Sequence, residues 1–165
     1  MDQSVLWNLS YGLYAIGVME GEVPQGCIVN TVFQITADGT IALSMNKNNH
    51  THGLIEQAGG FAVSIISEQT PALTIGRLGF FSGAKVEKFE GLPCEIKDGF
   101  PYLKDHCTGY LRCRVTGSYD AGTHTVFFAQ VEDAWKGEAL PVMTYEYYHK
   151  VVKGKAPKNA PTYQG

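Results

Sequence analysis

The chain has 165 residues, of which 44% are hydrophobic and 18% charged, and its formal net charge is −3. That length suits one compact domain whose core needs no metal or disulfide, and the near-neutral charge argues against a nucleic-acid partner, which requires clustered Lys and Arg. No apolar run approaches the roughly 20 residues of a membrane span, and no basic region precedes an apolar stretch at the start. We therefore expect a cytoplasmic protein with no membrane partner.

Strand patterns bounded by glycine dominate the chain. Alternating apolar residues or β-branched runs predict strands over residues 12–20, 26–36, 40–46 and 61–67. Two longer runs follow at 108–119 and 123–135, and Asp120-Ala121-Gly122 between them predicts a hairpin turn. Most of the sheet should therefore be antiparallel.

Helical patterns are few and short. Thr51–Ala58 stops at a glycine pair, and Thr70–Leu78 carries a proline in its first turn. Residues 85–89 and 144–151 are further candidates, although the tyrosines of the second also suit a strand. About seven strands with three or four short helices predict a mainly β fold, a closed or nearly closed antiparallel barrel with helices at its ends. We expect the barrel domain to span residues 1–152. Residues 153–165, which are polar and contain prolines, are expected to form an extended arm or a linker.

The four cysteines, at positions 27, 94, 107 and 113, do not have the spacing of a metal or disulfide site. No two form a CxxC pair, which zinc sites usually contain. We expect buried, reduced thiols and no bound metal.

The segment Ser44–His52 (SMNKNNHTH) has the composition of a phosphate-binding turn. A strand ends here and a helix is expected to begin near Asn49–Thr51, where free N–H groups and the positive end of the helix dipole suit an anion. Lys47 would add charge. The same residue types also form ordinary Asn-rich turns and helix caps, and the segment alone favours that interpretation.

Three further segments carry weaker signals. The polar pair Asn30-Thr31 interrupts a strand-like run, which indicates a bulge, a pair facing an internal ligand, or a pair satisfied by the sheet backbone. Arg77–Phe89 combines cations with a Ser-Gly turn but lacks a phosphate-loop motif. His124 begins a strand after a turn, where it is either an ordinary hairpin-end residue or a proton donor beside a reduced cofactor.

These segments occur in a familiar order. The residues concerned are Gly26–Thr31, Ser44–Lys47, Gly76-Arg77 with Phe81–Gly83 and Lys88-Phe89, and Gly122–Thr125. Together they resemble the flavin reductase-like family of FMN-binding split β-barrels, most closely flavoredoxins and the flavoprotein half of high-molecular-weight rubredoxins. The resemblance runs from Leu9 to Tyr163. It implies an antiparallel split β-barrel that binds FMN non-covalently at a homodimer interface.

The resemblance also implies roles for individual residues. Asn30, Thr31 and Val32 would line the isoalloxazine ring. The ribityl and phosphate segment would comprise Ser44, Met45, Asn46, Lys47, Asn49 and Thr51, and a loop with Arg77, Ser82, Gly83 and Lys85 would approach the phosphate or the partner subunit. His124 would lie beside the flavin, where reductases place the nicotinamide. Because Thr123 stands where the family pattern has an acidic residue, the flavin contacts are better supported than the nicotinamide contacts.

The implied activity is that of an NAD(P)H-dependent flavin reductase. Electrons would pass from NAD(P)H to flavin or to a small, rubredoxin-like redox-protein acceptor. In the fused relatives a cysteine-rich rubredoxin module follows the barrel, and because this sequence has no CxxC pair the acceptor would be external. Two alternatives stay open: a flavoredoxin-type electron carrier without efficient direct NAD(P)H oxidation, and a non-catalytic barrel that binds another ligand.

Overall fold

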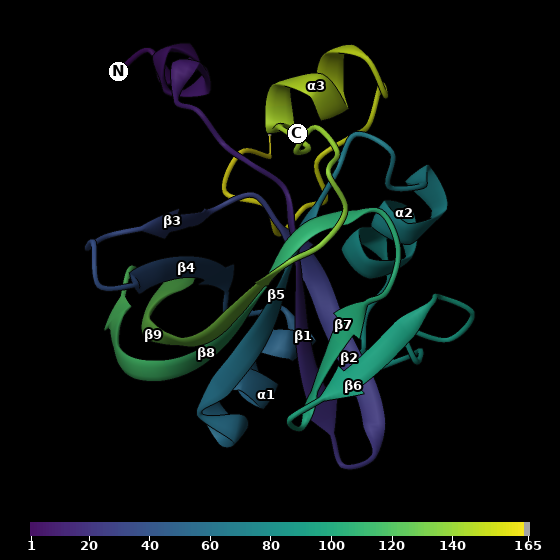
Figure 1. Cartoon of the computed structure of the whole chain (residues 1–165). Helices are drawn as coiled ribbons and strands as arrows, with labels where there is room; N and C mark the ends of the chain where they lie inside the picture. Colours follow the sequence, from purple (N-terminus) through teal and green to yellow (C-terminus); the bar gives the residue numbers. More distant parts are fainter. Residues whose placement is uncertain (164–165) are drawn as a thin grey trace.

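A curled antiparallel sheet dominates the computed structural model of the chain, which describes residues 1–163 (Figure 1). Its seven strands are hydrogen-bonded in the order β2-β1-β5-β8-β9-β4-β3. They are β1 (Tyr14–Glu20), β2 (Val23–Val29), β3 (Val32–Gln34), β4 (Thr40–Asn46), β5 (Gly60–Ile66), β8 (Cys107–Asp120) and β9 (His124–Lys136). Strands β6 (Cys94–Lys97) and β7 (Phe100–Leu103), which the sequence patterns did not predict, form a separate hairpin.

The junction between β2 and β3 explains why the sheet curls. These strands are its two opposite edges, yet only Asn30 and Thr31 separate them in sequence. Because this short link spans at most about 11 Å, the sheet must bend until its edges approach one another at that end. The predicted mainly β split barrel is confirmed, whereas the single strand predicted over 26–36 is wrong, because the chain changes edge at the polar pair.

Both faces of the central strands are buried. Phe61 and Val63 of β5 point into the barrel, where they pack with Ile55 of α1 (His50–Ala58). The alternate residues Ala62 and Ile66 belong to a second apolar cluster on the other face, which includes residues of α2 (Ala72–Phe80) and α3 (Tyr145–Lys150). The period-2 alternation of a strand therefore supplies two cores.

The predicted ends of α1 follow its capping residues. The Asn49 side chain accepts a hydrogen bond from the backbone N–H of Thr51 (3.1 Å), and Gly59 ends the helix in the left-handed region at φ 67°. Helix α2 begins after Pro71, and α3 forms within the predicted 144–151 segment. A short 3₁₀ helix, η1 (Gln3–Asn8), was not predicted; it buries none of its side chains and projects away from the sheet (Figure 1).

The helix predicted over 85–89 is wrong. The carbonyl of Ser82 accepts from the backbone N–H of Val86 (3.1 Å), but only a separate turn follows, in which the Glu87 carbonyl accepts from the backbone N–H of Glu90 (3.1 Å). Instead, the Gln25 side chain donates to the carbonyls of Gly83 (2.9 Å) and Val86 (3.3 Å). Side chains thus satisfy carbonyl groups that a helix would have used internally.

Among residues 1–163, no helix is long and apolar enough to cross a membrane. The same residues contain no group of three or more His, Cys, Asp or Glu arranged to hold a metal ion. All four cysteines are free thiols; Cys27, Cys107 and Cys113 are buried and Cys94 is half-buried.

Candidate functional site

A cleft of about 470 Å³ opens beside the Asn30-Thr31 junction, where the two edges of the sheet approach one another. We call this junction the seam of the barrel. One wall is formed by the end of β2 with Asn30 and by the end of β4 with the turn leading into α1. The opposite side comprises the C-terminal half of α2, the loop after it, α3 and the C-terminal arm. The cleft therefore lies where the sheet is split, as cofactor clefts often do in folds whose barrel interior is filled.

Asn30 connects the seam to the C-terminal arm. It is 5% exposed, and its Nδ2 atom donates to Oγ1 of Thr162 (2.9 Å). Its Oδ1 atom accepts from the Thr31 hydroxyl (2.9 Å), while the Thr31 carbonyl accepts from the backbone N–H of Ser44 (3.1 Å). The polar pair is thus hydrogen-bonded within the protein, and of the two only Asn30 faces the cleft.

The turn from β4 into α1 presents several polar groups to the cleft. Ser44, Met45, Asn46 and Asn49 line it, beside the first turn of the helix. Lys47 does not: its ammonium pairs with the Asp120 carboxylate (2.5 Å), and the two hold this turn to the β8–β9 hairpin. Hydrogen bonding and ion pairing with Lys47 hold the pKa of Asp120 below its ordinary value.

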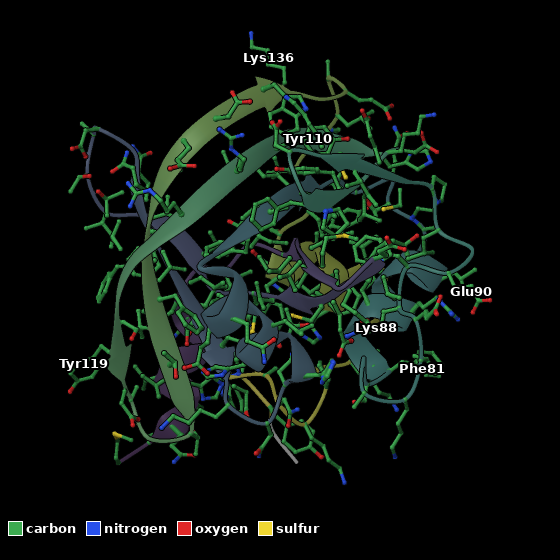
Figure 2. All side chains as sticks on the ribbon, turned by 90° about the horizontal axis from the view of Figure 1, so that it is seen from below. Phe81, Lys88, Glu90, Tyr110, Tyr119 and Lys136 are labelled. Atoms are coloured by element: carbon green, nitrogen blue, oxygen red, sulfur yellow. The ribbon has the colours of Figure 1, made fainter. Side chains whose placement is uncertain are left out.

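Lys88, in the loop after α2, is the one buried lysine among the described residues that line the cleft. It is 3% exposed, and within residues 1–163 its ammonium has no hydrogen-bond acceptor and no carboxylate partner. Burial lowers the pKa of Lys88, an effect that the nearby Cys27 thiol partly opposes. Figure 2 shows Lys88 inside the outline of the fold, whereas Glu90 and Lys136 project from its edge. A buried cation without a counter-ion is costly, so it indicates a site for an anion.

Hydrogen bonds from Arg77 stabilise the loop that contains Lys88. The Arg77 guanidinium donates to the carbonyls of Lys88 (3.2 Å) and Glu87 (3.0 Å) and pairs with the Glu90 carboxylate (3.3 Å). These contacts leave Arg77 outside the cleft wall, where it positions Lys88. Gly83 packs so tightly that a Cβ atom there would lie 2.9 Å from both Gln25 and His50.

The charged side chains that line the cleft are positive. Among the described residues that line it, none is an aspartate or a glutamate, although the whole chain is acidic. Lys88, Lys155 and Lys158 line it, together with His50, whose Nε2 atom is 3.0 Å from the Glu20 carboxylate outside the wall. Such a cleft favours ligands that carry several negative charges.

His124 lies behind this wall. It is paired with Asn46 across the β4–β9 ladder, and its Nδ1 atom is hydrogen-bonded with the Thr123 hydroxyl (2.9 Å). Its Nε2 atom is buried without a hydrogen-bond partner among residues 1–163. Burial lowers the pKa of His124 below 6.5, and the backbone of Asn159 partly opposes that effect. The imidazole is therefore neutral at pH 7.

The structure brings part of the predicted site to one place. The predicted residues that line the cleft are Asn30, Ser44, Met45, Asn46, Asn49 and Ser82. Those predicted to contact the ligand but lying outside its wall are Thr31, Val32, Lys47, Thr51, Arg77, Gly83, Lys85 and His124. Each ligand contact stays a prediction, and for the second group it depends on a partner subunit or on a rearrangement.

Several lining residues were not among the predicted ones. They include Asn48, His50, Lys88, Tyr145, Tyr148 and most of the arm between Lys155 and Tyr163. Lys88 was visible within the family-like segment, but in sequence it reads as part of a charged loop. The arm reads as a linker because it is polar and contains prolines.

Comparisons with known proteins identify the family and the fold of the chain. Residues 7–155 match the model of the flavin reductase like domain. The chain is 44% identical to the high molecular weight rubredoxin of Moorella thermoacetica, over 99% of this chain and 72% of that protein. It is 37% identical to the ferric-chelate reductase (NAD(P)H) of Archaeoglobus fulgidus, over 99% and 98% of the two chains. The solved NADH:FAD oxidoreductase of Streptomyces globisporus has the same fold, with a TM-score of 0.76 and 20% identity over 85% of this chain and 84% of that one.

The predicted family and the predicted enzyme class are therefore confirmed. The match covers most of the chain, including the seam, the β4–α1 turn and the Lys88 loop that form the cleft. The chain belongs to the flavin reductase-like family of flavin-dependent oxidoreductases.

Proposed function

We propose that this chain binds FMN non-covalently in the cleft and passes electrons from NAD(P)H, through that flavin, to free flavin or a small redox protein. The observation that carries the proposal is Lys88, a cation buried at the cleft without a counter-ion among residues 1–163. A terminal phosphate would supply that counter-ion. When bound, the flavin supplies the electron-carrying chemistry, so the protein itself needs no acid–base dyad.

The polar groups of the cleft suit the two ends of FMN. The phosphate is assigned to Lys88, the neighbouring Ser82 and the N-terminal turn of α1 near Asn49, whose N–H groups and dipole favour an anion. The ring and ribityl chain are assigned to Asn30 and the end of β4 at Ser44–Asn46. We propose FMN rather than FAD because Lys88, Ser82 and the N-terminal turn of α1 form one anion site, which suits a single terminal phosphate group.

We further propose that the protein acts as a homodimer. Val5, Leu6, Trp7 and Leu9 in and beside η1 are between 49% and 60% exposed, although all four are large and apolar. Apolar side chains gathered on one projecting segment are better covered by a second copy than left in water. A partner subunit would also bring new residues to the open side of the cleft.

The electron acceptor and the cellular site are proposed from the relatives and the composition. The similarity to a protein named high molecular weight rubredoxin supports a rubredoxin-like acceptor, and the same similarity favours a second candidate, an electron carrier with little direct NAD(P)H oxidation.

We propose that the protein is cytoplasmic. We also propose that it consists of a barrel, residues 1–152, and an arm, residues 153–165, of which the last two residues lie outside those described.

One experiment tests the function. The purified chain is incubated with FMN, freed of excess ligand by gel filtration and examined by absorption spectroscopy; we expect a flavin spectrum at one FMN per chain. Anaerobic mixing with NADH or NADPH should then bleach the visible bands rapidly. Protein that stays colourless refutes flavin binding, and a yellow protein that neither nucleotide bleaches supports the carrier.

A further inference from the structure

The C-terminal arm, residues 153–163, forms the outer wall of the cleft. It contains no helix or strand, yet most of its residues from Lys155 to Tyr163 line the cleft opposite the seam. A segment of this composition is expected to extend into solvent. Its position across the cleft indicates that it takes part in binding.

Hydrogen bonds hold the arm at both ends. Near its start, the Tyr148 hydroxyl donates to the carbonyl of Lys155 (3.3 Å), and the Gly154 carbonyl lies 2.9 Å from Nδ1 of His149. Near its end, Thr162 is hydrogen-bonded to Asn30 of the seam (2.9 Å) and to the Tyr145 hydroxyl. The span between these anchors therefore has a defined place over the cleft.

Two lysines lie within this anchored span. Lys155 and Lys158 both line the cleft, and neither makes an ion pair with any described residue. Unlike Lys88 they are solvent-exposed, so they can meet a ligand that enters after the flavin. His124, the first residue of β9, lies close to the same arm, because the backbone of Asn159 affects its pKa.

The cleft contains two lysines besides Lys88, the residue to which the proposed function assigns the flavin phosphate. This inference rests on that proposed function. A nicotinamide dinucleotide brings a pyrophosphate, and NADPH a third phosphate group. We infer that Lys155 and Lys158 bind the phosphate groups of the reduced nicotinamide dinucleotide, so that the arm is the second-substrate wall of the cleft.

The test uses the full chain loaded with FMN. NAD⁺ and NADP⁺, which cannot reduce the flavin, are titrated by calorimetry into the wild type and into Lys155→Gln, Lys158→Gln and the double variant. Because an exposed charge pair contributes only modestly to affinity, each single substitution should raise Kd about 3-fold and the double substitution about 10-fold. The dependence of Kd on salt should become shallower in the same order.

Lys153→Gln is the matched control. It removes the same charge from the same arm, but Lys153 does not line the cleft, so its Kd should stay within about 2-fold of the wild type. Equal losses in the control and the test variants, or an unchanged Kd in the double variant, overturn the inference.

FMN affinity is measured separately for every variant. A loss of FMN or FAD affinity as large as the loss of NAD⁺ affinity would assign the lysines to the flavin and overturn the inference while leaving flavin binding intact. A wild type that binds no FMN refutes the proposed function itself, and with it the inference.

Discussion

Replacement of Lys88 by methionine separates its two roles, as an unpaired buried cation and as a phosphate ligand. Methionine keeps the apolar stem and removes the ammonium. Hydrogen bonds to charged groups contribute about 1.5–3 kcal/mol, so the variant should bind FMN about 10- to 150-fold more weakly. Riboflavin, which has no phosphate, should bind the variant within about 3-fold of the wild type.

The same substitution should stabilise the flavin-free protein. Because burial lowers the pKa of Lys88, the folded chain binds a proton there less readily than the unfolded chain. At neutral pH the charged ammonium therefore opposes folding, and its removal should raise the free energy of unfolding by about 1–3 kcal/mol. The advantage should shrink as the pH rises towards 10.5, where the unfolded lysine also loses its proton.

Flavin fluorescence titrations with FMN and riboflavin measure the first effect, and urea denaturation of the flavin-free protein at pH 7 and pH 10 measures the second. Lys136→Met, at the exposed far end of β9, is the control for loss of one charge (Figure 2). Equal weakening of FMN and riboflavin, or an equal effect of the Lys136 variant, would refute the assignment of the phosphate to Lys88. Destabilisation of the flavin-free protein would refute the reasoning about its burial.

Three further predictions concern His124, the arm and the ends of α1. His124→Gln should slow reduction by NAD(P)H in stopped flow and leave the FMN Kd within about 2-fold of the wild type. Because the pKa of His124 in the folded protein lies below 6.5, the wild type should lose stability as the pH falls through 6.5, and the variant should lose less. Thr162→Val should free the arm from Asn30, so that trypsin cleaves after Lys155 and Lys158 faster than in the wild type; an unchanged cleavage rate would contradict the anchoring. Gly59→Ala should lower the free energy of unfolding by about 1 kcal/mol, because Gly59 has a positive φ. Gly53→Ala, in open space within the same helix, should raise that free energy by about 0.5–1 kcal/mol. Urea denaturation measures both, and effects of the same sign would refute this argument.

Local features of this fold could be predicted from sequence because their causes are local. Asn49 caps a helix and Gly59 ends it through the conformational preferences of those two residues, and Gly122 at φ 89° makes the β8–β9 turn in the same way. The predicted β4–α1 turn follows from the same rules, and four of the six residues predicted there, Ser44, Met45, Asn46 and Asn49, line the cleft, while their ligand contacts stay predictions.

The remaining features depend on contacts between distant segments. Nothing near Asn30 in sequence indicates that the chain changes sheet edges there, because the edge is defined by pairing with β4. The loop after α2 is shaped by Gln25, 58 residues before Gly83, which no local propensity includes. Burial of Lys88 follows from that loop. Lys47, in contrast, looked available for a phosphate because its partner Asp120 is 73 residues away.

The two-residue junction at Asn30-Thr31 makes the shape of one cleft wall depend on the whole sheet. Both edges of the sheet are attached to this link, and the wall beside it combines the end of β2 with the end of β4, to which the edge strand β3 pairs. A substitution that loosens the curvature of β8 or β9 should therefore shift these two strand ends relative to one another. We expect ligand affinity to fall in such a variant before the strands separate.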